Sequence, residues 1–225
     1  MVIHKEVKSY VIRASKLTKN QNKALQDYSE KFCIDYGSQR LADIFTNNNN
    51  IVCDIGFGMA SNLIDQALLH DDFNYLGIEV YPPGVGSALA SIARNGCENI
   101  KIIEHDAIEV LNNMIADDSF IKVQLLYPDP WPKKRHHKRR IVSPSFLNLV
   151  ARVLKSGGVF QVITDWDPYA EHIKALLVTD LRFVIASEAD FAPTLMSWPN
   201  PIGTAYAKKG INKGHTISNL IYKLS

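Results

Sequence analysis

Three carboxylates stand where short apolar segments of the chain end, and a pair of glycines follows the first of them. Asp54 closes the apolar run at 51–53 and leads into Gly56 and Gly58, where the absence of a Cβ lets the backbone turn tightly and approach a ligand. Glu79 follows the next apolar run, and a carboxylate at this point accepts hydrogen bonds from both hydroxyls of a ribose. Asp106 follows the third run and is able to accept a hydrogen bond from the amino group of adenine. Together these residues predict a pocket for an adenosyl group.

Each of these signals has a plainer interpretation when it stands alone. A glycine pair also occurs in ordinary tight turns, a carboxylate after a strand is often merely solvated, and Asp106 is equally suited to cap a helix. A dinucleotide-binding loop would need a third glycine at the position of Ser61, so the loop favours a nucleoside without a pyrophosphate. A nicotinamide-dependent dehydrogenase is therefore the less favoured alternative.

A fourth carboxylate, Asp129, is framed by prolines and followed at once by a basic run. The prolines at 128, 130 and 132 stiffen this loop and hold Asp129 at the end of an apolar segment. The basic residues of the run are Lys133, Lys134, Arg135, Lys138, Arg139 and Arg140. A charge run is usually a solvated face and occasionally a localisation signal, but its place beside a predicted adenosyl pocket favours the docking of phosphates. His136 and His137 lack further ligands at metal-binding spacing, so we predict no metal site.

The overall composition is that of an ordinary globular protein. The basic run carries more positive charge than the net +2 of all 225 residues, so the remainder is acidic and the field of the run is concentrated. No apolar run is long enough to span a bilayer, and the N-terminus lacks an apolar signal segment. Cys33, Cys53 and Cys97 form no CxxC pair. We predict a cytoplasmic protein with reduced cysteines that does not bind membranes.

Strand-like and helix-like segments alternate along the chain and place these residues. Strands are expected at 51–53, 75–78, 102–103, 123–126 and 159–163, and apolar residues at helical spacing follow each of them. Ser143 and Pro144 open the fourth of these helices, which Gly157 and Gly158 are expected to end after Leu154. The alternation predicts a doubly wound, mostly parallel α/β sheet, whose ligands bind at the carboxyl ends of the strands.

Further segments extend this core at both ends of the chain. The first 20 residues are mixed and basic, and a helix is expected at about 20–32. Two closing strands are expected at 182–186 and 216–224, around a loop-rich insertion. We therefore divide the chain into an N-terminal arm and helix, 1–35, and a main domain, 36–225.

The segment from Pro128 to Arg140, PDPWPKKRHHKRR, closely resembles the signature of the bacterial tRNA (guanine-N7-)-methyltransferases. The resemblance runs from about Ser9 to the C-terminus. Other matching segments in the family's order are Gly56-Phe57-Gly58, Gly77-Ile78-Glu79, His105-Asp106-Ala107 and Thr164-Asp165-Trp166. The family methylates guanine 46 in the variable loop of tRNA with S-adenosylmethionine as the cofactor. The resemblance implies a Rossmann-like class I methyltransferase sheet, mostly parallel, with an antiparallel C-terminal strand.

The resemblance also implies a role for each matching residue. The S-adenosylmethionine pocket would be lined by Asp54, Gly56, Gly58, Glu79, Asp106 and Asp129, and Asp129 would also be the catalytic residue. The guanine would be contacted by Lys133, Asp165 and Thr204. The tRNA would be bound by Arg135, His136, His137, Lys138, Arg139 and Arg140. The protein is expected to be a monomer or a homodimer.

Two departures from the family pattern bear on activity. The family usually has a glycine where Ala60 stands, a change that would slightly crowd the cofactor loop. Its C-terminal Thr-Lys-Phe-Glu element appears here as Thr204-Ala205-Tyr206-Ala207, so a lysine and the glutamate expected to grip the guanine are missing. These missing residues leave open a catalytically impaired tRNA-binding homologue. A methyltransferase for another RNA or a small molecule is a further alternative, although it would not need the basic run where it stands.

Overall fold

A seven-stranded sheet forms the centre of the protein in the computed structural model, which describes residues 7–11, 16–37, 44–186, 214 and 216–225. The strands are β1 (Asn50–Ile55), β2 (Phe73–Glu79), β3 (Ile100–Glu104), β4 (Phe120–Leu126), β5 (Leu154–Thr164), β6 (Phe183–Ile185) and β7 (Ser218–Leu224). The described helices are α1 (Lys19–Phe32), α2 (Ser61–Leu69), α3 (Pro82–Asn95), α4 (Ala107–Asn113), the 3₁₀ helix η2 (Lys134–Arg139), α5 (Pro144–Val153) and α6 (Asp167–Thr179).

The order of the strands creates a switch point at the middle of the sheet. The spatial order is β3-β2-β1-β4-β5-β7-β6, so the chain builds outward from β1 in one direction and then from β4 in the other. Within the group β1 to β5, every pair of neighbouring strands is parallel. Strand β7 runs antiparallel to both β5 and β6. The predicted doubly wound sheet with an antiparallel C-terminal strand is confirmed. A crevice for a ligand is expected at the carboxyl ends of β1 and β4, because the chain leaves these two neighbouring strands toward opposite faces of the sheet.

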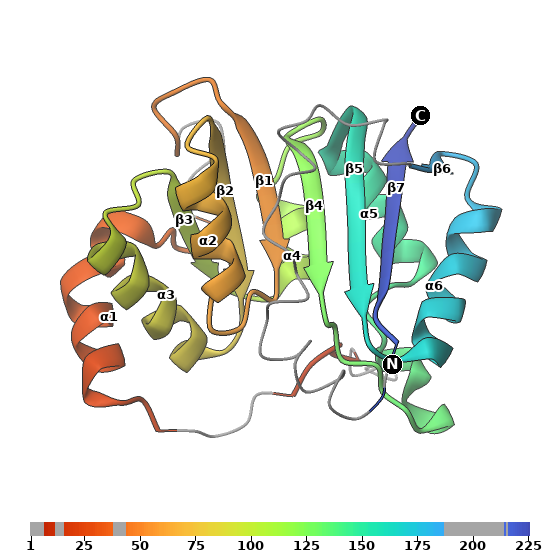
Figure 1. The fold of residues 1–225 in the computed structure, drawn as a ribbon, viewed down its shortest axis with the longest axis horizontal. Coiled ribbons are helices and arrows are strands. Elements are labelled where there is room, and N and C mark those ends of the chain that lie inside the picture. The colour runs from red at the N-terminus through yellow and green to blue at the C-terminus, as the bar shows by residue number, and fades with distance from the viewer. Residues whose placement is uncertain (1–6, 12–15, 38–43, 187–213, 215) are drawn as a thin grey trace, which may run out of the picture.

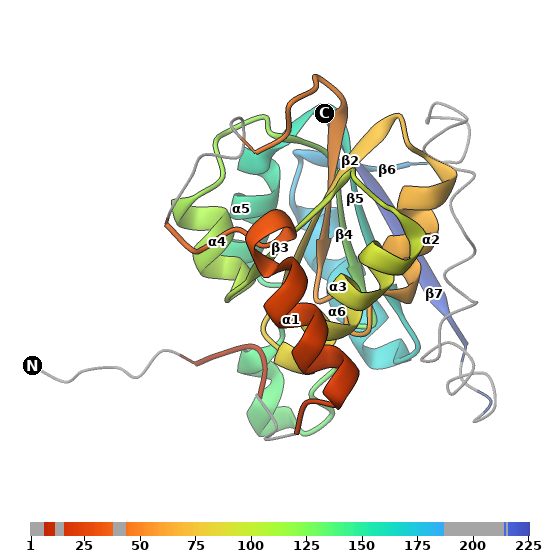
Figure 2. The same ribbon diagram turned by 90° about the vertical axis from the view of Figure 1, so that its left-hand side faces the viewer.

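Helices cover the sheet on both faces and give it two apolar cores (Figures 1 and 2). Helices α1, α2 and α3 pack on one face, around buried residues such as Val52, Tyr75 and Leu89. Helices α4, α5 and α6 pack on the other face, around buried residues such as Cys53 and Phe146. Neighbouring residues of β1 thus belong to opposite cores, because successive side chains of a strand point to opposite faces.

Helix α1 is fastened to the start of α3. Thr18 caps α1 by accepting a hydrogen bond from the backbone N–H of Gln21, and the side-chain oxygen of Gln21 accepts one from the backbone N–H of Thr18. The same Gln21 amide donates to the carbonyl of Pro83 at 3.0 Å. After α1, Cys33 forms a parallel bridge with Ile102 of β3. These contacts pack α1 on the sheet domain, and the proposed boundary between 1–35 and 36–225 stays a prediction.

The end of α5 differs from the sequence-based expectation. Ser143 caps the helix as predicted, but the helix ends at Val153, and β5 begins at Leu154. Gly157 and Gly158 therefore lie inside β5, where the pairing with β4 skips from Leu154 to Val159. Gly157 takes a φ of +74°, which suits a bulge rather than a helix end here. The prediction that the two glycines terminate the helix was wrong because a bulge also selects glycine.

Within the described ranges, no helix is long and apolar enough to cross a membrane. Among the same residues, no group of three or more His, Cys, Asp or Glu side chains is arranged to hold a metal ion. The three cysteines are free, and burial raises the pKa of the Cys53 thiol well above its usual value.

Candidate active site

The carboxyl ends of β1, β2, β3 and β4 meet at one edge of the sheet, the lower edge in Figure 1. Asp54 lies near the end of β1, Glu79 ends β2, and Asp106 caps α4 just after β3. Asp129 lies in the loop that leaves β4. The structure therefore gathers at one edge the four carboxylates that the sequence singled out.

The glycine-rich loop after β1 is hydrogen-bonded to Glu79 at the end of β2. Gly56 and Gly58 have φ angles of +71° and +59°, a left-handed conformation that side chains with a Cβ rarely adopt. The Glu79 carboxylate accepts hydrogen bonds from the backbone N–H groups of Gly58 (2.8 Å), Val80 (2.7 Å) and Tyr81 (3.1 Å). Burial raises the pKa of Glu79, while these three N–H groups oppose the rise. Glu79 thus fixes the loop against the end of β2.

A glycine in α3 closes the same loop from the side. A Cβ on Gly84 would lie 2.4 Å from the carbonyl oxygen of Gly58, a distance that no real Cβ tolerates. Ala60 follows with a φ of +66° and is 1% exposed, so it adopts the strained conformation that a glycine would adopt freely. The loop is therefore determined by its contacts with Glu79 and Gly84, and the departure at Ala60 is accommodated as local strain.

Asp54 is a buried carboxylate with an open hydrogen-bonding position. It is 1% exposed, and none of the described residues donates a hydrogen bond to its Oδ1 atom. Burial raises its pKa to about 7, while the amide of Gln124 and the charge of Lys122 oppose the rise. Lys122 and Gln124 point to the same face of β4, beside Asp54, and burial lowers the pKa of Lys122 well below its usual value. A cationic or N–H-bearing ligand group at this edge would complete the hydrogen bonding of Asp54.

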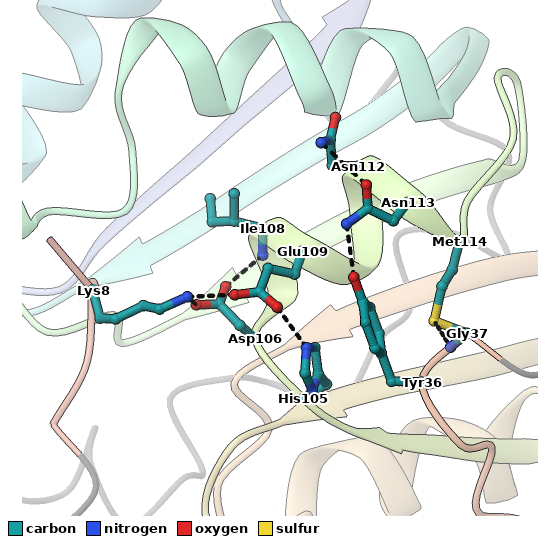
Figure 3. A network of polar contacts seen from close by, with 10 residues as sticks. All are labelled: Lys8, Tyr36, Gly37, His105, Asp106, Ile108, Glu109, Asn112, Asn113 and Met114. Carbon is teal, nitrogen blue, oxygen red and sulfur yellow. Dashed lines mark hydrogen bonds and ion pairs between the residues drawn. The ribbon is translucent and has the colours of Figure 1, made fainter. Parts of the chain in front are cut away.

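Asp106 has the helix-capping role that the sequence left open. Its Oδ1 atom accepts a hydrogen bond from the backbone N–H of Ile108 at 2.9 Å, at the start of α4. Its Oδ2 atom lies 3.0 Å from the ammonium of Lys8, which also pairs with Glu109 (Figure 3). The side chain of Asp106 is only 7% exposed. Capping does not exclude adenine binding, since a carboxylate has about four lone pairs for acceptance.

The Asp129 loop has strained backbone on both sides of the carboxylate. Tyr127 and Trp131 have φ angles of +53° and +44°, although neither is glycine. The Tyr127 N–H donates to the carbonyl of Ile163 at 2.7 Å, which ties the start of the loop to β5. Asp129 itself is exposed. Strain of this kind persists where the surroundings determine the conformation, and it is common at functional sites.

The basic run forms the 3₁₀ helix η2, directly after the Asp129 loop and at the same edge of the sheet (Figure 1). Lys133, Lys134, Arg135 and Lys138 are exposed, and His136 and His137 are half-buried. Desolvation and the neighbouring positive charges lower the pKa of His136, so this ring is neutral at neutral pH. The run presents exposed positive charges at the edge of the sheet where the four carboxylates lie.

Arg140 differs from the other basic residues and from the expectation for it. It is 6% exposed, its Nε donates to the carbonyl of Pro130 at 2.9 Å, and its guanidinium lies 4.9 Å from the ring centre of Tyr169. Arg140 therefore holds the Asp129 loop against α6 and does not project toward a phosphate. The sequence alone could not separate it from its neighbours, because all six basic residues have the same charge signature.

Comparisons with known proteins bear on what this edge does. A sequence family described as putative methyltransferase matches residues 48–220. The tRNA (guanine-N(7)-)-methyltransferase of Francisella tularensis subsp. novicida (strain U112) is 43% identical over 222 residues, which cover 97% of this chain and 95% of that protein. The chain belongs to the tRNA (guanine-N7-)-methyltransferase family. The enzyme of the same description from Shewanella amazonensis (strain ATCC BAA-1098 / SB2B) is 39% identical over 223 residues, with 97% and 92% coverage.

Solved structures of similar fold are also methyltransferases. The crystal structure of the 16S rRNA methyltransferase KamB matches with a TM-score of 0.57 at 13% identity, covering 95% of this chain and 96% of that one. The aminoglycoside resistance methyltransferase NpmB1 matches with a TM-score of 0.52 at 18% identity, covering 84% and 95%. At these identities the likeness concerns the fold, and it supports the class I methyltransferase sheet predicted from the family resemblance.

Of the three residues predicted to contact the guanine, the structure describes two. Asp165 is half-buried just after β5, and Lys133 is exposed between Asp129 and η2. Both lie at the same edge of the sheet as Asp129. Thr204, and the departures at Ala205 and Ala207, lie outside the described residues.

Sequence reasoning missed several residues that shape this site. Lys122 is buried beside Asp54, and the available signal was two polar residues, Lys122 and Gln124, at alternate positions of an apolar strand. Lys8 and Trp131 connect the N-terminal segment to the site. No pattern in the sequence announces their contacts, because each joins positions about a hundred residues or more apart.

Proposed function

We propose that this chain transfers the methyl group of S-adenosylmethionine to N7 of guanine in tRNA, at position 46 of the variable loop. One observation carries the proposal. The carboxylates suited to an adenosyl group and the exposed cations of η2 share one edge of the sheet, joined by the rigid loop that holds Asp129. Membership in the tRNA (guanine-N7-)-methyltransferase family supports the same reaction.

The residues present fit S-adenosylmethionine. Gly56 and Gly58 offer a backbone without side chains, and the buried Asp54 has an Oδ1 atom that lacks a donor among the described residues. Asp54, Gly56 and Gly58 would hold the amino-acid part of the cofactor, Glu79 the ribose, and Asp106 the adenine amino group. Bound there, the cofactor supplies a methyl group on a positively charged sulfur.

The chain's own residues need not remove a proton from the substrate. Guanine N7 carries a lone pair and no hydrogen, so methyl transfer requires alignment of N7 with the methyl group rather than a general base. The guanine gains positive charge as the bond forms, and the Asp129 carboxylate stabilises that charge and orients the base. Asp165 serves as a second acceptor for the base edge, and Lys133 contacts the guanine from the side of η2.

The exposed cations of η2 dock the tRNA through its phosphates. Arg135 and Lys138 are exposed, and Arg139 lies at the junction with the N-terminal segment. Contacts with phosphates provide affinity and register and carry no base specificity. The two histidines, His136 and His137, add hydrogen-bonding groups to this surface. Because the proposed substrate is tRNA, we propose that the reaction takes place in the cytoplasm.

The direct test is methyl transfer to an unmodified tRNA transcript. Labelled S-adenosylmethionine is incubated with the protein and the transcript, and the methylated base is mapped. Label at N7 of guanine 46 is expected, and a transcript with adenine at that position serves as the control. Label elsewhere, or on another class of RNA, would overturn the assignment.

The same assay addresses the impaired homologue suggested by Ala205 and Ala207. Binding of tRNA without methyl transfer would favour that alternative. An Ala207→Glu protein restores the family's glutamate. A gain of activity in this variant would show that the departure limits the rate, whereas equal rates would show that the chain compensates for it.

A further inference from the structure

The short N-terminal segment 7–11, here called the N-terminal strap, reaches the adenine end of the proposed cofactor site. The ammonium of Lys8 lies 3.0 Å from Oδ2 of Asp106 and also pairs with Glu109 (Figure 3). These side-chain contacts join Lys8 to α4 across about a hundred positions of sequence. An ion pair between an N-terminal segment and a carboxylate expected to bind the cofactor is not needed to form the sheet.

The strap encloses the Asp106 carboxylate. Oδ1 of Asp106 accepts the N–H of Ile108, Oδ2 pairs with Lys8, and the side chain is 7% exposed. Burial and the charge of Asp106 raise the pKa of the Tyr10 hydroxyl, which belongs to the same strap. Lys8 therefore occupies a position on Oδ2 of Asp106 for which an adenine amino group would compete.

The next two residues of the strap contact the Asp129 loop and η2. The indole Nε1 of Trp131 donates to the carbonyl of Ser9 at 3.0 Å, and the guanidinium of Arg139 donates to the carbonyl of Tyr10 at 2.7 Å. The same guanidinium lies 4.1 Å from the ring centre of Trp131. The strap thus contacts the adenine end and the basic run through adjacent residues.

We propose that the N-terminal strap couples cofactor binding to tRNA binding, with Lys8 holding the place of the adenine amino group on Asp106. A tRNA phosphate that attracts Arg139 removes a hydrogen bond from Tyr10 and loosens the strap. Loosening the strap eases the departure of Lys8 from Asp106, so that tRNA tightens the binding of the cofactor. By linkage, the cofactor tightens the binding of tRNA by the same factor. This inference rests on the proposed function.

The local charges make the departure of Lys8 feasible. Glu109 keeps a second partner, because Nε2 of His105 lies 2.7 Å from its Oε2 atom. Lys8 itself is 35% exposed, so its ammonium is readily solvated when it leaves. Asp106 keeps its bond from Ile108 and would gain one from the ligand. No buried charge is left without a partner by the exchange.

The experiment measures the affinity for S-adenosylhomocysteine with and without saturating tRNA transcript. For the unaltered protein, tRNA is expected to tighten the affinity about five- to tenfold. In Lys8→Met, S-adenosylhomocysteine alone should bind about fivefold tighter, and tRNA should add less than about twofold. Lys8→Arg keeps the charge and should behave as the unaltered protein does, and so should Lys16→Met, which neutralises an exposed lysine beyond the strap.

A second variant tests the tRNA side of the strap. Trp131→Phe keeps an aromatic ring beneath Arg139 but removes the N–H that binds Ser9. This variant is expected to lose part of the gain that tRNA gives. Melting curves for each variant establish that the fold is intact.

The outcomes separate this inference from the proposed function. Unchanged or weaker binding of S-adenosylhomocysteine by Lys8→Met, or an undiminished effect of tRNA, overturns the coupling while the methylation assay stands. Failure of the unaltered protein to bind S-adenosylhomocysteine or to methylate tRNA rejects the proposed function, and the coupling with it.

Discussion

Oε2 of Glu79 accepts a hydrogen bond from the backbone N–H of Gly58 at 2.8 Å, so a carboxylate at the end of β2 holds the loop that follows β1. This bond joins the two halves of the proposed cofactor site, beside the backbone hydrogen bond from the N–H of Gly56 to the carbonyl of Ile78. A residue selected for a ribose therefore also determines the shape of the glycine loop, and changing it should affect both.

Glu79→Gln should weaken binding of S-adenosylhomocysteine about tenfold or more. Glutamine offers one acceptor oxygen where three N–H groups converge, and hydrogen bonds to a charged group contribute about 1.5–3 kcal/mol. Titration calorimetry gives the affinity. Glu98→Gln, at an exposed glutamate paired with Lys31, is the matched control. Affinity within twofold of the unaltered protein in Glu79→Gln would contradict this role.

Binding of S-adenosylhomocysteine should depend on pH through Asp54. Burial raises the pKa of Asp54 to about 7, so the free protein loses the negative charge as the pH falls through 7. The ammonium of the ligand favours the charged carboxylate, so affinity should rise as pH increases to about 7 and then level off, by up to about tenfold per unit below the pKa. Asp54→Asn should bind more weakly with a flat profile. A profile of the same shape in both proteins would assign the titration to another group.

Replacement of Asp129 should slow methyl transfer with little effect on tRNA affinity. Loss of one well-placed electrostatic group typically costs about 100- to 1,000-fold in rate. Asp129→Asn keeps the shape of the side chain and Asp129→Ala removes it, and single-turnover methylation measures both. Near-normal turnover in the two variants would reject the catalytic role.

The basic residues of η2 should divide into two classes by their response to salt. The double variant Arg135→Ala and Lys138→Ala removes exposed cations, so the slope of log Kd for tRNA against log salt should fall by roughly 1–2. Arg140→Ala should leave that slope unchanged and lower the melting temperature, because Arg140 is buried against Pro130 and Tyr169. Binding measurements across a salt series and melting curves distinguish the classes. An unchanged slope in the double variant would remove the docking assignment.

The sheet was predictable because its signals are local and repeated. Short apolar runs alternate with segments whose apolar residues have helical spacing, and this pattern predicts alternating strands and helices. In a parallel sheet the residues that follow the strands, such as Glu79, then lie at the same edge. The family resemblance added the antiparallel last strand, which the structure confirms. Gly157 was misread because glycine ends helices and forms bulges alike, and only the pairing of β5 with β4 distinguishes the two.

The details of the site were less predictable because they depend on long-range contacts. Arg140 and Arg135 have the same charge, and only the three-dimensional neighbours make one buried and the other exposed. Asp106 was left between helix cap and ligand acceptor, and the structure shows the cap while the ligand role stays a prediction. The contact of Lys8 with Asp106 has no sequence pattern at all.

The hydrogen bond from the side chain of Gln21 to the carbonyl of Pro83 has a consequence for the N-terminal strap. It fixes the first turn of α1 on α3, and the short stretch of chain before Thr18 then attaches Lys8 to a fixed point of the molecule. A lysine so attached is an intramolecular competitor, present near Asp106 at a high effective concentration whatever the ions in solution. Cutting the chain between the strap and α1 would abolish that advantage while leaving every residue of the pocket in place.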